Sequence, residues 1–197
     1  MTPAQGGAAA GAVTTARASA GPPAQPPRQA GTPHRALRNT LGRYATGVAV
    51  VTARSPNGLP VAMTINSFTA VSLDPPLILW CLAVRSARGA AFTAATHFAV
   101  HVLTASQHQL ATRFAGPAEQ THDLPMTTGP HRLPLLPDTA ATLICRQTGL
   151  FTAGDHTVLL AEVESHTAAP GQTLLFADGA FHPGPSTGNG RVCPVDG

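Results

Sequence analysis

Residues 63–76 read MTINSFTAVSLDPP, and this stretch decides the fold of the chain. Short polar side chains alternate there with large apolar ones, which is the pattern of a β-strand with one polar face. The polar members are Thr64, Asn66, Ser67, Thr69 and Ser72, and the apolar members are Ile65, Phe68, Val71 and Leu73. The polar face is either the solvated side of a half-buried sheet or a wall facing a polar ligand, and this pattern alone leaves both interpretations open.

The segments on either side predict further strands. Residues 47–54 (GVAVVTAR) are β-branched and precede the turn signal SPNG at 55–58, so we expect a hairpin whose second arm contains the opening stretch. Pro75 and Pro76 should end that arm, because proline cannot donate a ladder hydrogen bond. Residues 77–83 (LILWCLA) are continuously apolar and predict a strand buried on both faces.

The rest of the chain adds short helices and more strands. The expected helices cover 34–44, 86–95 and 106–114, the last with Ser106 as its N-cap. The expected strands cover 97–103, 140–148 and 157–164, followed by a hairpin of 174–176 and 180–181 around Asp178-Gly179. Residues 115–138 have little periodicity and read as a functional loop. Strands outnumber helices and mostly adjoin one another, so we expect a mainly β antiparallel barrel with a few short peripheral helices.

Composition divides the chain into three regions. Residues 1–33 are rich in Ala, Gly and Pro and predict a disordered tail, residues 34–182 a single folded domain, and residues 183–197 a flexible end. Outside the first tail, ten arginines face nine acidic residues without any basic run, so nucleic-acid binding is not expected.

Neither a membrane span nor a secretory signal is recognisable, and we expect a soluble, cytoplasmic protein that does not bind membranes. Three cysteines without metal-type spacing fit a reducing compartment.

Few residues suggest chemistry on their own. The chain has no GxSxG elbow, P-loop or GxGxxG fingerprint. His97 and His101 are four residues apart, but on a strand this places them about 13 Å apart, so no metal site is expected and both read as polar-face histidines.

His156 follows a Gly-Asp turn and is either exposed or directed into a cleft. Taken singly, Arg88 and Arg113 read as surface arginines.

Seven motifs nevertheless follow one another in an informative order. They are GVAVVT at 47–52, MTINSFTAVSLDPP at 63–76, Ser86, FAVHVL at 98–103, Arg113-Phe114, Gly154-Asp155-His156 and LLFADGAF at 174–181. Their order and spacing over residues 35–182 resemble the short-chain flavin reductases, the NAD(P)H:flavin oxidoreductases that serve two-component flavin monooxygenases. Each motif alone is weak evidence for this family, whereas the whole series is specific for it.

The resemblance implies an FMN-binding split β-barrel with Greek-key topology, which forms a homodimer with a flavin groove near the subunit interface. It implies an enzyme that moves hydride from NADH or NADPH to FMN or FAD and supplies reduced flavin to a partner monooxygenase. Two alternatives remain: a flavin- or haem-binding split-barrel protein without turnover, and a flavoenzyme that retains its flavin and acts on a small molecule. The Pro/Gly-rich end resembles reductases of aromatic polyketide pathways.

The resemblance also assigns roles to individual residues. Those implied to hold the flavin are Pro60, Val61, Ala62, Met63 and Thr64 along the isoalloxazine, Asn66 and Ser67 as hydrogen-bonding groups, Cys81, Leu82 and Ala83 at a strand end, Ser86, Ala87 and Arg88 at the phosphate, and Arg113 with Phe114. His156 is implied to be the catalytic residue beside the nicotinamide. The stretch implied to bind the pyridine nucleotide is Phe176, Ala177, Asp178 and Gly179.

The chain departs from the family pattern in three places. Ala70 stands where Ser is frequent, His101 stands where Asn is common, and residues 116–124 lack the usual Lys-Phe ending. These departures put single hydrogen bonds in doubt, and they leave the expected flavin groove in place.

Overall fold

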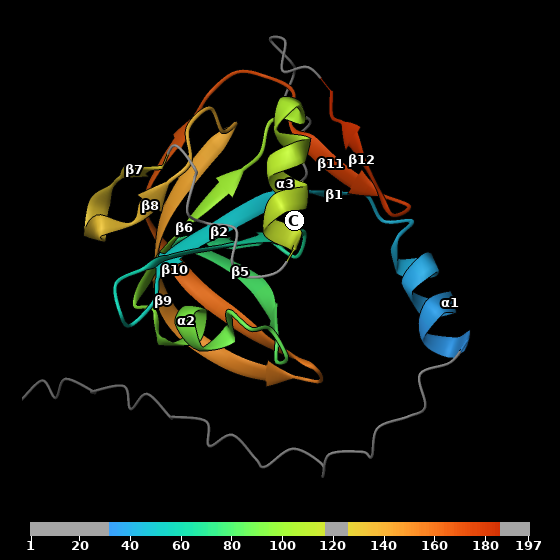
Figure 1. The fold of residues 1–197 in the computed structure, drawn as a ribbon, viewed down its shortest axis with the longest axis horizontal. Helices are drawn as coiled ribbons and strands as arrows, with labels where there is room; N and C mark the ends of the chain where they lie inside the picture. Colours follow the sequence, from blue (N-terminus) through green and yellow to red (C-terminus); the bar gives the residue numbers. More distant parts are fainter. Residues whose placement is uncertain (1–31, 117–125, 186–197) are drawn as a thin grey trace, which may run out of the picture.

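Seven strands form one antiparallel sheet in the computed structural model, which describes residues 32–116 and 126–185 (Figure 1). Their order across the sheet is β3-β2-β6-β9-β10-β5-β4. The strands are β2 (Ala49–Arg54), β3 (Pro60–Ile65), β4 (Thr69–Leu73), β5 (Pro76–Ala83), β6 (His97–Val102), β9 (Ala141–Ala153) and β10 (His156–Ala168). The mainly β architecture predicted from the sequence is confirmed, with helices only at the periphery.

The stretch 63–76 is not one strand, and this part of the sequence interpretation is wrong. β3 ends at Ile65 and β4 begins at Thr69, and these two strands are the opposite edges of the seven-stranded sheet. The hairpin of β2 and β3 and the end of β4 at Leu73 agree with the prediction, but Pro76 does not end pairing, because it opens β5 and pairs with Leu73. Period-two alternation continues across the break, so the pattern concealed the change of partner strand.

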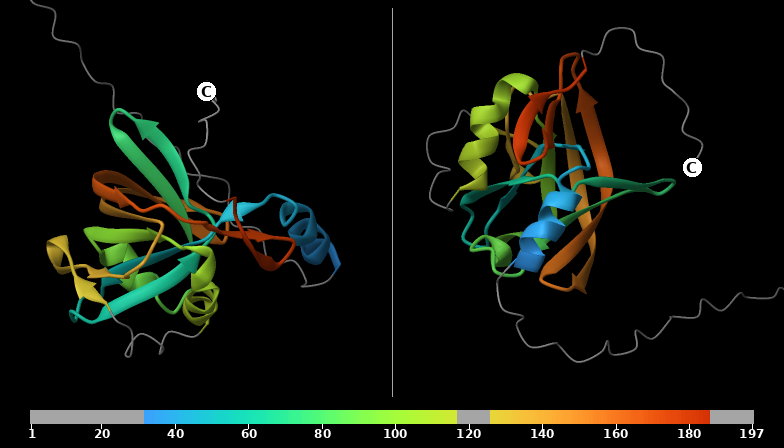
Figure 2. Two further views of the ribbon diagram at one scale, coloured as in Figure 1. Left: turned by 90° about the horizontal axis from the view of Figure 1, so that it is seen from above. Right: turned by 90° about the vertical axis from the view of Figure 1, so that its right-hand side faces the viewer.

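The short connection between the two edges forces the sheet to curl. In a flat sheet of seven strands, the edge strands would be about 29 Å apart at the usual strand spacing. The four peptide steps from Ile65 to Thr69 span at most about 14 Å when fully extended. The sheet therefore bends until β3 and β4 approach each other, and Figure 2 shows the resulting barrel-like curvature.

Ser67 fixes the crossing between the two edges. The backbone N–H of Cys81 in β5 donates to Ser67 Oγ at 3.0 Å, and the same hydroxyl lies 3.4 Å from the Cys81 carbonyl oxygen. The side chain thus takes the place of a backbone partner where β4 has not yet begun to pair with β5. One hydroxyl in the connection is therefore structural.

Smaller elements cover the ends and one side of this sheet. They are β1 (Thr46–Gly47), β11 (Leu174–Ala177) and β12 (Ala180–Pro183) in a three-stranded sheet, β7 (Thr127–Thr128) and β8 (Pro134–Leu135) in a two-stranded one, α1 (Thr32–Leu41), α2 (Gly89–Ala94), α3 (His108–Ala115), and the 3₁₀ turns η1 (Ala105–Gln107) and η2 (Pro130–Arg132). Within the described residues, no helix is long and apolar enough to cross a membrane.

The core lies on one face of β5, and the prediction of a strand buried on both faces is wrong. Ile78, Trp80 and Leu82 are buried, whereas the alternate residues of β5 remain partly or fully exposed. Trp80 is fully buried and packs edge-on against Phe92 and Phe98, with ring centroids 5.4 and 5.8 Å apart. A second cluster around Leu103, Phe114 and Leu174 fills the space under α3.

Three further expectations need correction. The helix predicted at 34–44 forms as α1, but its apolar Leu37 and Leu41 stay exposed. The third helix is preceded by η1, so Ser106 lies inside that turn and does not cap a helix. β9 and β10 are 13 residues each, and the expected connection 149–156 is mostly strand, with only a tight turn at Gly154 and Asp155.

His101 is buried between two threonines and is not the polar-face residue expected from the sequence. Thr52 donates its hydroxyl proton to the Pro134 carbonyl oxygen at 2.5 Å, so the His101 Nε2–H must donate to Thr52 Oγ1, 3.0 Å away. His101 Nδ1 then accepts from Thr142 Oγ1 at 3.2 Å, and Thr142 accepts from Thr139 at 2.9 Å. Each hydroxyl proton is used once, which requires a neutral imidazole.

We expect the buried His101 to lower the free energy of unfolding as the pH falls. Burial lowers its pKa to about 4 against an opposing contribution from the Pro134 carbonyl. The unfolded state then binds more protons between pH 6.5 and about 4, so stability drops as the pH falls through this window, by about 2 kcal/mol from pH 7 to pH 5. Urea unfolding at several pH values should show that His101→Asn removes this part of the slope. The exposed control His166→Asn should keep it, and equal slopes in both variants would contradict the assignment.

We also expect Ser67→Ala to destabilise the unliganded chain by about 1 kcal/mol, because the Cys81 N–H loses its acceptor. Thermal or urea unfolding measures this cost. Ser165→Ala is the matched control, since Ser165 is exposed on β10 and should change stability by less than about 0.5 kcal/mol. An effect of the same size in both variants would mean that the Ser67 contact does not hold the crossing.

Candidate functional site

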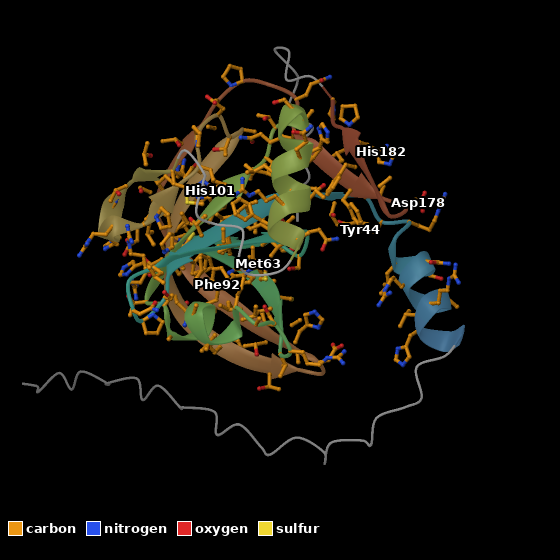
Figure 3. The ribbon with its side chains drawn as sticks, viewed as in Figure 1. Tyr44, Met63, Phe92, His101, Asp178 and His182 are labelled. Carbon is orange, nitrogen blue, oxygen red and sulfur yellow. The ribbon has the colours of Figure 1, made fainter. Side chains whose placement is uncertain are left out.

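Contacts join the five predicted flavin-holding segments at one end of the barrel. The Ser86 hydroxyl lies 3.8 Å from Met63 Sδ, which joins the segment after β5 to β3. Thr64 Oγ1 donates to the Ala111 carbonyl oxygen at 2.7 Å, which joins β3 to α3. Figure 3 shows Met63 near the lower end of α3. Further side-chain hydrogen bonds join Ser67 to Cys81 and Arg88 to Phe114, so the end of β3, the connection after it, the end of β5, residues 86–88 and the end of α3 lie close together. Pro60 lies at the other end of β3, opposite Arg54.

Arg88 links this cluster to the end of α3. Its guanidinium donates to the carbonyl oxygens of Phe114 at 3.3 Å and Gly116 at 2.6 Å. These are among the carbonyls that a helix leaves without partners at its carboxyl end, where a cation is favourable. Burial lowers the pKa of Arg88 from its ordinary value. The interaction fixes the Arg88 side chain against the carboxyl end of α3.

One donor of Arg88 fits a phosphate ligand. Among the described residues, Arg88 Nε is buried and has no hydrogen-bond partner. An unpaired buried N–H is unfavourable unless an acceptor binds to it. A phosphate oxygen is such an acceptor, so the residues present fit the phosphate end of a flavin nucleotide.

The predicted flavin-contacting side chains differ in how available they are. Thr64 and Ser67 already hydrogen-bond to Ala111 and Cys81, whereas Asn66 is exposed and its side chain has no hydrogen-bond partner among the described residues. The side chains of Ala62, Leu82 and Phe114 are buried in the core. Those left partly or fully exposed are Pro60, Val61, Met63, Cys81, Ala83, Ala87 and Arg113. The contacts themselves remain predictions.

His156 lies at the same end of β5 as these residues. It opens β10 directly opposite Ala83, and the preceding Asp155 accepts the backbone N–H of Val84 at 2.9 Å. Asp155 Oδ1 is 2.7 Å from His156 Nδ1. Hydrogen bonding from His156 and the charge of its ring lower the pKa of the Asp155 carboxyl. The carboxylate orients the imidazole and leaves Nε2 toward the open side, where the side chain is 43% exposed.

Residues 176–179 lie in a different part of the structure from His156. Asp178 and Gly179 form the left-handed turn between β11 and β12, with φ angles of 49° and 80°. Arg43 Nη1 lies 2.8 Å from Asp178 Oδ2 and ties this turn to the residues after α1. Figures 1 and 2 both show the β11–β12 turn well away from the β9–β10 turn that carries His156. A single chain does not bring the two predicted nicotinamide-binding elements together.

A second polar cluster was missed by the sequence interpretation. His97 was considered with His101 because of their spacing, but its ring stacks on His131, and both imidazoles reach Glu164. His131 lies in the stretch 115–138 that we expected to be a loop, and Glu164 lies in a strand predicted correctly. No local spacing joins three residues so far apart in sequence, so only the His-rich character of 115–138 could have suggested the cluster.

Comparison with known proteins identifies the type of fold. Residues 41–185 match the family described as the flavin reductase-like domain. The FMN reductase (NADH) SmoA of Agrobacterium fabrum is 46% identical over 147 residues, which cover 75% of this chain and 84% of that protein. Several other curated relatives are longer, and the match spans about half to two thirds of their length.

Solved structures agree with this match. The NADH:FAD oxidoreductase SgcE6 of Streptomyces globisporus aligns with a TM-score of 0.72 and 37% identity, covering 85% of this chain and 98% of that chain. The flavin reductase of styrene monooxygenase from Pseudomonas putida S12 aligns with a TM-score of 0.69 and 31% identity, covering 76% and 97%. The split-barrel prediction is thereby confirmed.

We expect Thr64 and Asn66 to have separable roles. Thr64→Val should lower stability by about 1 kcal/mol, because the bond to Ala111 is lost, while flavin affinity stays within about twofold. Asn66→Ala should lower flavin affinity about tenfold, the value of one hydrogen bond, with stability nearly unchanged. Urea unfolding and quenching of flavin fluorescence measure the two quantities. The reverse pattern would show that Thr64 rather than Asn66 contacts the flavin.

Proposed function

The chain belongs to the flavin reductase-like domain family, and from this premise we propose that it transfers hydride from NADH to FMN or FAD and releases the reduced flavin to a separate monooxygenase. It is an NAD(P)H:flavin oxidoreductase. The relatives reported above include an FMN reductase and an FAD oxidoreductase that use NADH, and one reductase component of a monooxygenase. These support NADH as the donor, and NADPH remains an alternative.

The observation that carries the proposal is the convergence of β3, the end of β5, residues 86–88 and α3 around an unpaired buried donor of Arg88. A bound flavin supplies the ring atom that accepts hydride, so the reaction needs no acid–base pair from the protein. The protein's contribution is positioning: Arg88 and Ser86 hold the phosphate, and the Asn66 amide faces the ring.

His156 is proposed to act on the nicotinamide side. His156 Nδ1–H donates to the Asp155 carboxylate, so Nε2 of the neutral imidazole can accept from the nicotinamide amide N–H, or the ring can lie against the nicotinamide. Its place opposite Ala83 sets it beside the strand end that lines the proposed flavin groove. In this role the imidazole aligns the donor ring and does not transfer a proton in the hydride step.

We propose that the functional form is a homodimer. In one chain, His156 and residues 176–179 are separated, so a second copy is needed if both elements bind one nicotinamide nucleotide (Figures 1 and 2). Large apolar side chains are also exposed on β4 and β9, the strands that flank β5 and β10. These side chains are Val71, Leu73, Leu150 and Phe151. Such a surface is suited to burial between two copies.

The partner is proposed to be a flavin-dependent monooxygenase. The Pro/Gly-rich end that suggested an aromatic polyketide pathway lies mostly outside the described residues. The pathway therefore stays a prediction from the sequence.

Stopped-flow absorbance tests the function and the role of His156 together. Mixing the protein with FMN or FAD and NADH or NADPH should bleach the oxidised flavin, fastest with NADH. His156→Ala should reduce the second-order rate constant for NADH about tenfold or more and leave the flavin dissociation constant within about twofold. The control His166→Ala, exposed on β10, should match the wild type. The absence of bleaching with either nucleotide would leave a flavin-binding protein without turnover, and equal loss of flavin and NADH binding would remove His156 from the nicotinamide side.

A further inference from the structure

A compact set of three metal-ligating side chains lies away from the proposed flavin groove. His97 Nε2 is 3.5 Å from Glu164 Oε1, and His131 Nε2 is 2.8 Å from Glu164 Oε2. The two imidazoles stack with ring centroids 3.7 Å apart and an interplanar angle of 12°. One ligand atom from each of the three residues can be chosen so that all lie within 4.8 Å of one another. The residues come from β6, η2 and β10.

The backbone is irregular at two of the three ligands. Val163 pairs with Cys145 and Ser165 pairs with Ile144, so Glu164 is the extra residue of a β-bulge in β10. His131 and Arg132 are consecutive non-glycine residues in the left-handed region, with φ angles of 51° and 59°. Bulges redirect a side chain, and left-handed non-glycine residues are unfavourable by about 1 kcal/mol or more. Both irregularities direct their side chains to the same point, which is typical of a built site.

The ion pairs and hydrogen bonds around the cluster leave its ligand atoms available. Arg146 also lies near Glu164, with Nε 3.7 Å from Oε1, and it pairs with Glu162. Two carboxylates therefore face one guanidinium. His97 Nδ1 lies 3.1 Å from the Thr96 hydroxyl, an outer hydrogen bond that leaves Nε2 available as a ligand.

A cavity gives access to the cluster. A pocket of about 510 Å³ is lined by His97 and His131 together with residues 94–96, Arg132, Leu133 and Arg54. Two of the three ligands line this space, so a zinc ion held by all three could keep a fourth position for water.

We propose that His97, His131 and Glu164 bind one divalent transition-metal ion of the Zn²⁺ type and thereby join the η2 turn to the sheet. Two imidazoles and one carboxylate are a ligand set that zinc accepts, whereas Mg²⁺ and Ca²⁺ prefer oxygen ligands only. The site is independent of flavin chemistry, because none of its residues belongs to the proposed groove.

Binding needs only small movements. In a tetrahedral site with bonds of about 2.0–2.1 Å, ligand atoms are about 3.3 Å apart. The distance of 2.8 Å between His131 and Glu164 must lengthen slightly, and that of 3.5 Å between His97 and Glu164 is already suitable. The rings must tilt out of their stacked arrangement so that both Nε2 lone pairs converge. Any proton on Nε2 moves to Nδ1 or to solvent.

Calorimetric titration of the full, tag-free, chelator-treated chain with ZnCl₂ tests the proposal. The wild type should bind one equivalent with an affinity that falls about 100-fold or more in Glu164→Gln and in His131→Asn. Asn tolerates the left-handed conformation, so the turn is retained. Glu162→Gln and His166→Asn are matched controls that remove a carboxylate two residues away on β10 and an imidazole on the same strand. Both should bind Zn²⁺ within about threefold of the wild type.

A second readout separates loss of the site from loss of the fold. Zn²⁺ should raise the melting temperature of the wild type and of both controls but not of Glu164→Gln, while flavin binding without metal stays unchanged in all of them. If His131→Asn fails to fold, His97→Asn and Glu164→Gln decide the outcome. The proposal is overturned if the wild type binds Zn²⁺ no better than Glu164→Gln, or if the control variants lose as much affinity as the ligand variants.

Discussion

The three-residue connection from β3 to β4 is the constraint on which the structure depends. It joins the two edges of a seven-stranded sheet, and its short reach is compatible only with a curled sheet. Curling creates an interior that Trp80 and its aromatic neighbours fill, and it removes the long open edges that a flat sheet would expose. Ser67 stabilises the crossing because it supplies the acceptor that the Cys81 N–H would otherwise lack.

The same crossing explains why the candidate flavin site lies where it does. At the point where the strand order is interrupted, backbone groups and short polar side chains replace continuous ladder pairing. The end of β3, the connection itself and the end of β5 meet there, and α3 closes the region through Arg88. A ligand that needs several hydrogen bonds and no acid–base pair is suited to this crossing, because Arg88 Nε and the Asn66 amide have no partners among the residues that the structure describes.

Sequence reasoning predicted the strands and helices better than it predicted which strands pair with one another. The β2–β3 hairpin, the β11–β12 hairpin and β6 follow from local patterns, and they form as expected. The split of 63–76 between two edges did not follow, because alternation reports only which face a residue occupies and not which strand it pairs with. The buried His101 and the His131–Glu164 contact also depend on pairing between distant segments. For the site, the chain-long resemblance grouped segments that the fold joins by contacts, but it could not show that Thr64 and Ser67 already bond to Ala111 and Cys81.

The described part of 115–138 has a structural role that its lack of periodicity concealed. The β7–β8 segment packs over β6, where Leu133 and Leu135 cover Ala99 and the Pro134 carbonyl accepts from Thr52. This cover excludes water from His101, which therefore stays neutral, and the η2 turn at its end brings His131 onto His97. A single covering segment therefore gives two histidines of β6 different surroundings. His101 is buried in a chain of hydrogen bonds, whereas His97 lies at the edge of the covering segment beside Glu164. A metal ion bound by His97, His131 and Glu164 would attach the η2 turn to the sheet beside the apolar contact of Leu133.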